Sequence, residues 1–278
     1  LSIPTLFKAV YSVNKRQIYR HLKRLDDIYN STKGESERIA FYYHVGYINY
    51  YILTRQFNKA KNMCLSFFPL IKNSISLNTI SNNGGAHLEM TSVLFRLEEF
   101  TEAMLYANKT LQIFREQTFN QILAYEYCFL GNFYTKKHAA ATDIFNQVQN
   151  IPQINSSVIR KEKWNYLAAY NYYKIGDISK SKELLDNCKN LTVNKSGWYL
   201  GKKLLLSIIS IQEKEADPTL LKLENLLKLF RTLEEEYIMR FKAIYKVVKF
   251  LGNNQFDFKL TLEKQKHYLD LLLSLIHI

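Results

Sequence analysis

The residues that could do chemistry in this sequence are few and scattered. Metal sites and acid–base or nucleophilic catalysis need histidines, cysteines or carboxylates that act in close groups. The histidines lie far apart, none with a second histidine or cysteine at metal-ligand spacing: His21, His44, His87, His138, His267 and His277. Gly84-Gly85 is not followed by the lysine and serine or threonine of a phosphate-binding loop. The sequence therefore predicts no enzyme, no metal site and no cofactor.

The cysteines Cys64, Cys128 and Cys188 form an odd, widely spaced set without a CxxC pair. Each lies in an apolar helical pattern, where a free thiol packs as a small hydrophobic side chain, so we expect no disulfide framework. No apolar run approaches the roughly 18 residues that cross a bilayer. We expect a reducing, cytoplasmic location and no membrane segment.

The net charge of +13 comes from 38 Lys+Arg against 25 Asp+Glu and is compatible with a nucleic-acid partner. The charge is spread over most of the chain, however, and only residues 15–24 form a local basic cluster. Excess lysine on exposed helix faces is common and needs no polyanion. Nucleic-acid binding is therefore not expected, and the charge favours at most an acidic partner.

The elements that position these residues are predicted to be helices. Glycine and proline number only 9 and 4 in 278 residues, too few for an all-β fold with a turn every 8–12 residues or so. Apolar residues recur at helical steps, as at Ile18, Leu22, Leu25 and Tyr29. The fold class is predicted to be all-α.

Four segments repeat one order of residue types: Tyr47–Phe67, Glu89–Leu111, Tyr127–Val148 and Asn165–Cys188. In each, an aromatic-rich helix leads to a short turn, which in the third segment is expected to be shortened. A small residue three positions into the second helix follows at spacings of 43, 38 and 40, namely Ala60, Ala103, Ala141 and Ser181. The sequence therefore consists largely of helical hairpins.

This pattern resembles the tetratricopeptide repeat family, whose regular repeat has 34 residues, and the resemblance covers residues 41–188 best. Small residues let the paired helices approach, and Tyr51, Tyr134 and Tyr172 would fill the groove beside them. The resemblance implies an α-solenoid, a right-handed superhelical array of antiparallel helix pairs. We expect one continuous array over 1–278, with N-terminal helices over 1–40 and looser hairpins over 189–278. Irregular hairpins of the same general kind are an alternative, because spacings near 40 depart from the family pattern.

In this family the first helices of the repeats line a concave groove that takes an extended peptide or a partner helix. The resemblance implies that this groove would be lined here by Tyr42, Asn49, Phe95, Arg96, Asn132, Lys136, Lys163, Tyr166, Tyr170, Tyr173 and Lys174. Some members hold a C-terminal carboxylate with lysines, asparagines and arginines, of which Asn49, Asn132, Lys136 and Lys163 supply a part. For each tyrosine, packing against an adjacent hairpin is the alternative.

These observations predict a non-enzymatic protein- or peptide-binding scaffold. The alternative is a ligand- or peptide-sensing module of a bacterial transcription regulator, with a DNA-binding domain N-terminal to or at the start of this sequence. Residues 14–25 resemble the recognition helix of a helix-turn-helix protein. Because the chain begins with Leu1, we expect further residues before it, and residues 273–278 resemble an artefactual tail. The sequence determines neither the partner nor the oligomeric state.

Overall fold

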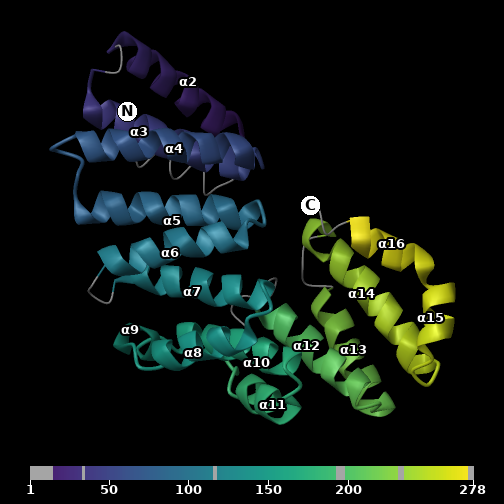
Figure 1. Ribbon diagram of the computed structural model, residues 1–278. Helices are drawn as coiled ribbons and strands as arrows, with labels where there is room; N and C mark the ends of the chain where they lie inside the picture. The colour runs from purple at the N-terminus through teal and green to yellow at the C-terminus, as the bar shows by residue number, and fades with distance from the viewer. Residues whose placement is uncertain (1–14, 33–34, 115–117, 192–197, 231–234, 275–278) are drawn as a thin grey trace. The chain divides into compact units, whose positions relative to one another are not determined.

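The computed structural model describes residues 15–32, 35–114, 118–191, 198–230 and 235–274. Within these ranges every regular element is a helix, and consecutive helices pack in pairs (Figure 1). The chain divides into two compact units, Leu1–Ile151 and Pro152–Ile278. The predicted all-α fold of helical hairpins is confirmed.

Unit 1 is built from a leading helix and the first three predicted hairpins. Its described helices are α2 (Lys15–Ser31), α3 (Glu37–Leu53), α4 (Phe57–Asn73), α5 (Ile80–Arg96), α6 (Phe100–Ile113), α7 (Phe119–Tyr134) and α8 (His138–Val148). Helix α3 pairs with α4, α5 with α6 and α7 with α8, and α2 packs on α3. Each of the first three repeated segments lies within one of these hairpins.

Unit 2 continues with the fourth hairpin and the helices after it. Its described helices are α9 (Pro152–Asn155), α10 (Val158–Lys174), α11 (Ile178–Asp186), α12 (Trp198–Gln212), α13 (Ala216–Phe230), α14 (Glu235–Asn253), α15 (Phe258–Lys264) and α16 (Lys266–Ser274). Helix α10 pairs with α11 and α12 with α13, and α14 packs against α13, α15 and α16.

One turn geometry joins the two helices of a hairpin in both units. The middle residue of each three-residue turn is left-handed, at Arg55, Glu98, Lys136, Gly176 and Lys214. In the first turn the backbone N–H of Gln56 donates to the Tyr51 carbonyl at 2.8 Å, which is the hydrogen bond that closes a Schellman helix end. The turn of the third hairpin is Thr135–Lys137, as long as the others, so the expectation of a shortened turn was wrong.

The small residues that open the second helices are fully buried, as predicted. Ala60, Ala103, Ala141 and Ser181 are each 0% exposed, so the partner helix lies directly against them. The same position in α13 and α15 holds Thr219 and Thr261, which are also buried. The repeat pattern therefore continues at a spacing of about 40 residues into the region where only looser hairpins are expected from the sequence.

The aromatic residues expected to fill the grooves do so unequally. Tyr51 and Tyr172 are half-buried, but Tyr134 is 53% exposed. The Tyr134 ring stacks on Phe100 of the preceding hairpin, with ring centroids 4.8 Å apart. The expectation that Tyr134 fills a groove was therefore wrong, because its outer face remains in solvent.

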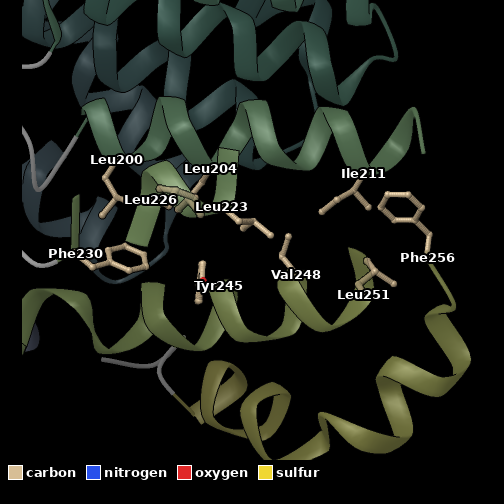
Figure 2. Close-up of a cluster of buried hydrophobic side chains, with 10 residues drawn as sticks. All are labelled: Leu200, Leu204, Ile211, Leu223, Leu226, Phe230, Tyr245, Val248, Leu251 and Phe256. Carbon is tan, nitrogen blue, oxygen red and sulfur yellow. The ribbon is translucent and has the colours of Figure 1, made fainter. Parts of the chain in front are cut away.

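The later helices of unit 2 share a continuous apolar core (Figure 2). Side chains of α12, α13 and α14 interdigitate there, and the Phe230 ring meets Tyr245 edge-on at 6.0 Å between centroids. The cluster comprises Leu200, Leu204, Ile211, Leu223, Leu226, Phe230, Tyr245, Val248, Leu251 and Phe256. Burying this apolar surface is what stabilises hairpins that could not fold singly.

The cysteines are all free and buried, as the sequence predicts for small core residues. Burial raises the pKa of each thiol, so Cys64, Cys128 and Cys188 stay protonated. Over the described part of the chain, no helix combines the length and the apolar character that crossing a membrane requires.

Candidate functional site

Helix α10 positions more of the predicted site residues than any other described helix. Its N-terminus is capped by Ser157, whose hydroxyl accepts from the Arg160 amide at 3.4 Å. One side of the helix is buried and carries Trp164 and Leu167. The opposite side carries, at helical steps, the partly buried Lys163, Tyr166, Tyr170 and Tyr173 and the exposed Lys174.

At the C-terminal end of this side, two tyrosines and a lysine form one cluster. The Tyr170 and Tyr173 rings stack with centroids 6.4 Å apart and planes 20° apart. The Lys174 ammonium lies 5.6 Å from the Tyr170 ring and 5.9 Å from the Tyr173 ring. A cation over an aromatic face gains electrostatic stabilisation, which restricts an otherwise flexible side chain. Burial, with Tyr170 nearby, raises the pKa of the Tyr173 phenol, which therefore stays neutral.

At the N-terminal end, Trp198 of α12 completes the site. The Lys163 ammonium lies 4.8 Å from the Trp198 ring, and the Tyr166 ring meets Trp198 in a T-shaped contact at 5.7 Å. Gly201 makes room for this contact, because any Cβ there would overlap the Tyr166 hydroxyl. We call these six side chains the α10–Trp198 platform: Lys163, Tyr166, Tyr170, Tyr173, Lys174 and Trp198.

The platform is cationic and has no carboxylate from its own helices. The single acidic residue of α10 and α12 is Glu162, which is 4% exposed. Both Glu162 oxygens accept from Asn190, one from its backbone amide at 2.6 Å and one from its side chain at 2.8 Å. Lys202 of α12 donates to the Cys188 carbonyl at 2.8 Å, and burial lowers the pKa of its ammonium. The positive charge of the platform itself comes from Lys163 and Lys174.

The predicted site residues of α3 and α5 are engaged in packing. The Phe95 ring contacts Phe100 at 5.0 Å and Tyr127 at 5.2 Å between centroids. Arg96 is exposed but donates to the Ser92 hydroxyl at 2.9 Å on its own helix. Tyr42 is half-buried, and its ring meets Phe41 edge-on. These side chains form no continuous aromatic and cationic row comparable with α10.

The partial set for holding a carboxylate terminus is not prearranged. The Asn49 amide donates to the Val45 carbonyl at 2.8 Å, and the Asn132 amide donates to the Cys128 carbonyl at 2.9 Å. Lys136 was predicted on the first helix of its hairpin but lies in the turn, with φ 62°. That placement was wrong because α7 ends at Tyr134 and the turn begins at Thr135, whereas a shortened turn would have begun later in the chain.

Trp198 is the residue of the platform that the sequence prediction missed. It lies at the start of α12, outside the four recognised segments.

The basic cluster at residues 15–24 lies on α2. Leu22 is buried there, with Leu25, Tyr47 and Tyr50 packed against it. Arg20, Lys23 and Arg24 are exposed, whereas the side chains of residues 15–19 lie outside the described ones. Residues 275–278 of the suspected tail also lie outside the described residues. Helix α2 thus packs on α3 with its apolar side and exposes part of its basic side.

These features define a class. Stacked helical hairpins with a common turn and buried small residues are tetratricopeptide-like helical repeats. No protein-family model matches the chain, and no curated protein sequence matches it significantly. Among solved structures, the chain is similar to the crystal structure of the apo form of RapI, with a TM-score of 0.74 and 10% sequence identity. The match covers 96% of this chain and 74% of the other, and at this identity it shows the fold alone.

Among the described residues, no group of three or more histidine, cysteine or acidic side chains is arranged so that it could hold a metal ion. The platform offers aromatic faces, phenol hydroxyls and ammonium groups instead. Such groups bind a ligand through stacking, hydrogen bonds and charge.

Proposed function

We propose that this chain is a non-enzymatic peptide-binding module and that the α10–Trp198 platform holds an extended peptide. The observation that carries the proposal is a row of partly exposed tyrosines with a lysine at each end and a tryptophan beside it. Tyrosine, tryptophan and cationic side chains are enriched where peptides and proteins bind.

The rigidity of the platform supports this proposal. The rings contact one another in two pairs, Tyr166 with Trp198 and Tyr170 with Tyr173, and each lysine lies over a ring, so a ligand would order few additional side chains. Preordered side chains lower the entropic cost of binding. The fold comparison is consistent with the proposal, because the similar structure is described as an apo form.

The remaining expectations are proposed on the same basis. We place the chain in the cytoplasm, since buried free thiols suit a reducing compartment. A single array running through both units stays a prediction, and so does a role as the sensing module of a transcription regulator. The packing of α2 on α3 adds no support to the second.

The experiment that tests the proposal uses a displayed library of 12-residue peptides selected on the full chain. The double variant Tyr170→Ala/Lys174→Ala should fold, as judged by circular dichroism, and should bind the selected peptides at least tenfold more weakly. The matched control is Phe258→Ala/Lys259→Ala, an exposed aromatic and lysine pair on α15. Unchanged affinity of the platform variant, or an equal loss in the control, would overturn the proposal.

A further inference from the structure

We infer that a cavity in unit 1 is a second binding site, which takes a small uncharged ligand of the nucleobase class. The ligand is planar and carries an N–H donor next to a carbonyl acceptor, as the lactam ring of hypoxanthine does. This site goes beyond the proposed peptide-binding function and does not depend on the α10–Trp198 platform. The cavity has an uncharged lining, exposed apolar side chains and one pair of hydrogen-bonded asparagines, and these features together point to such a ligand.

The cavity has a volume of about 1160 Å³ and lies where α5 begins, α6 ends and α7 begins. Its described lining consists of four amide, two hydroxyl and four apolar side chains. None of these side chains is charged, although charged residues make up 23% of the chain. A charged ligand would lose hydration there without gaining a counter-charge from the lining. The cavity therefore favours an uncharged ligand.

The apolar part of the cavity suits a flat ring. The Phe114 ring lies directly against α5 at Gly84, where any Cβ would overlap it. Ile80 and Phe119, the first residues of α5 and α7, are 69% and 58% exposed. Large apolar side chains gain free energy when a ligand covers them, and a nucleobase stacks favourably on a phenylalanine ring.

Asn78 and Asn83 supply a defined acceptor and donor on the wall of the cavity. The Asn83 side-chain amide donates to the Thr79 carbonyl and to Asn78 Oδ1, both at 2.8 Å. Because a carbonyl can only accept, the first bond fixes which atom of the Asn83 amide is the nitrogen, and the second bond then fixes the Asn78 amide. Within the described part of the chain, Asn83 Oδ1 and Asn78 Nδ2 make no hydrogen bond.

This pair complements the edge of a lactam. The ligand N–H can donate to Asn83 Oδ1, and the neighbouring ligand carbonyl can accept from Asn78 Nδ2. Asparagine pairs in a similar way with a base edge that offers one donor and one acceptor. Gln112 and Asn120 also line the cavity, and neither side chain makes a hydrogen bond among the described residues. They provide partners for further polar groups of the ligand, such as ribose hydroxyls.

The experiment titrates the full chain with inosine by isothermal titration calorimetry. The comparison ligand is 1-methylinosine, in which a methyl group replaces the hydrogen of the lactam N–H. We expect inosine to bind with one-to-one stoichiometry and 1-methylinosine to bind at least tenfold more weakly. No saturable binding of inosine, or equal binding of the two nucleosides, would overturn the inference.

Variants of the lining locate the site. Asn78→Asp replaces the donor with an oxygen, and Phe119→Ala removes the exposed ring, so each should weaken inosine binding at least tenfold. Phe119→Tyr keeps the ring and should retain the affinity. The matched control is Asn58→Asp, an exposed asparagine of α4 outside the described lining, which should bind inosine like the wild-type chain.

Circular dichroism checks that each of these variants is folded. Wild-type affinity in Asn78→Asp or Phe119→Ala, or an equal loss in Asn58→Asp, would overturn the assignment of this cavity as the site.

Two further ligands test the chemical class. Inosine 5′-monophosphate should bind no more tightly than inosine, and a tenfold gain would overturn the uncharged ligand. N-acetylphenylalanine amide also carries an aromatic ring and amide groups, and tighter binding of this compound than of inosine would overturn the nucleobase in favour of a peptide. The platform variant Tyr170→Ala/Lys174→Ala should bind inosine normally, so failure of this inference and failure of the proposed function are distinguishable.

Discussion

Helices α5 and α10 are both the first helix of their hairpins, yet the residues near their C-termini make different contacts. Phe95 and Tyr173 each lie three residues before the left-handed turn residue, Glu98 or Gly176. The Phe95 ring contacts Phe100 and the ring of Tyr127 from the next hairpin. The corresponding ring of Tyr173 stacks instead on its own helix.

The residues that follow Phe95 and Tyr173 also differ in their contacts. Arg96 bonds to Ser92 on its own helix, whereas Lys174 lies over two tyrosine rings. Helix α5 also carries the half-buried Glu89, and burial raises the pKa of its carboxyl group. The acidic residue of α10, Glu162, instead accepts hydrogen bonds from Asn190. Equivalent repeat positions therefore do not have equivalent roles, because the neighbouring hairpin decides which side chains it covers.

Matched alanine substitutions should give the largest contrast. Phe95→Ala should lower the free energy of unfolding by about 2 kcal/mol, since it removes a half-buried ring with several aromatic contacts. Tyr173→Ala should lower the free energy of unfolding by less than about 1 kcal/mol but should weaken binding of the selected peptides. Urea unfolding and a binding titration measure both effects, and equal losses of stability would remove the distinction between the helices.

Alanine substitutions at two glycines test the contact between Tyr166 and Trp198, with Gly201 at the contact and Gly85 as the control. The expected changes in stability are smaller than for Phe95→Ala. Gly201→Ala displaces the Tyr166 hydroxyl, and we expect a loss of about 1 kcal/mol and severalfold weaker peptide binding. Gly85→Ala in α5 meets no atom within 4 Å and should raise stability by about 0.5–1 kcal/mol. Thermal unfolding distinguishes the two, and a stabilising Gly201→Ala would contradict the close contact with Tyr166.

The smallest effect is a pH dependence expected of unit 1. His44 stacks on Phe67 and His87 packs on Phe68, and burial lowers the pKa of both imidazoles below 6.5. Their neutral forms are favoured in the folded state, so their contribution is complete above about pH 6.5, the unfolded pKa, and declines as pH falls below it. Hydrogen exchange at pH 7.5 and 5.5 should show faster opening of α4 at the lower pH.

The control for this prediction is the variant His44→Phe/His87→Phe. Phenylalanine keeps a ring at each position but takes up no proton, so the pH dependence of α4 exchange should shrink. The same pH dependence in this variant would show that other groups cause it.

Much of the fold could be predicted because it depends on local and periodic features. Ala60, Ala103 and Ala141 recur where two helices touch, and each is buried as predicted. The repeat was not recognised from the sequence after Ser181, where the equivalent position holds a threonine. Thr219 and Thr261 replace alanine in the last hairpins, and a threonine there does not stand out in a sequence.

The candidate site was predictable only in part. Tyr170, Tyr173 and Lys174 could be placed together on one side of a helix because their spacing is local. Lys136 was misplaced because the length of a turn depends on a left-handed residue, and here that residue is a lysine rather than glycine. Trp198 was missed because it reaches α10 from a different hairpin.

The sequence by itself therefore determined the helices, their pairing and the small residues between them, since these follow from periodicity within some 40 residues. The tertiary structure alone decided which aromatic rings are covered and which form the platform. That choice depends on contacts between hairpins, as with Tyr127 on Phe95 and Trp198 beside Tyr166. Such contacts are set by how successive hairpins pack, and no local pattern of residues encodes them.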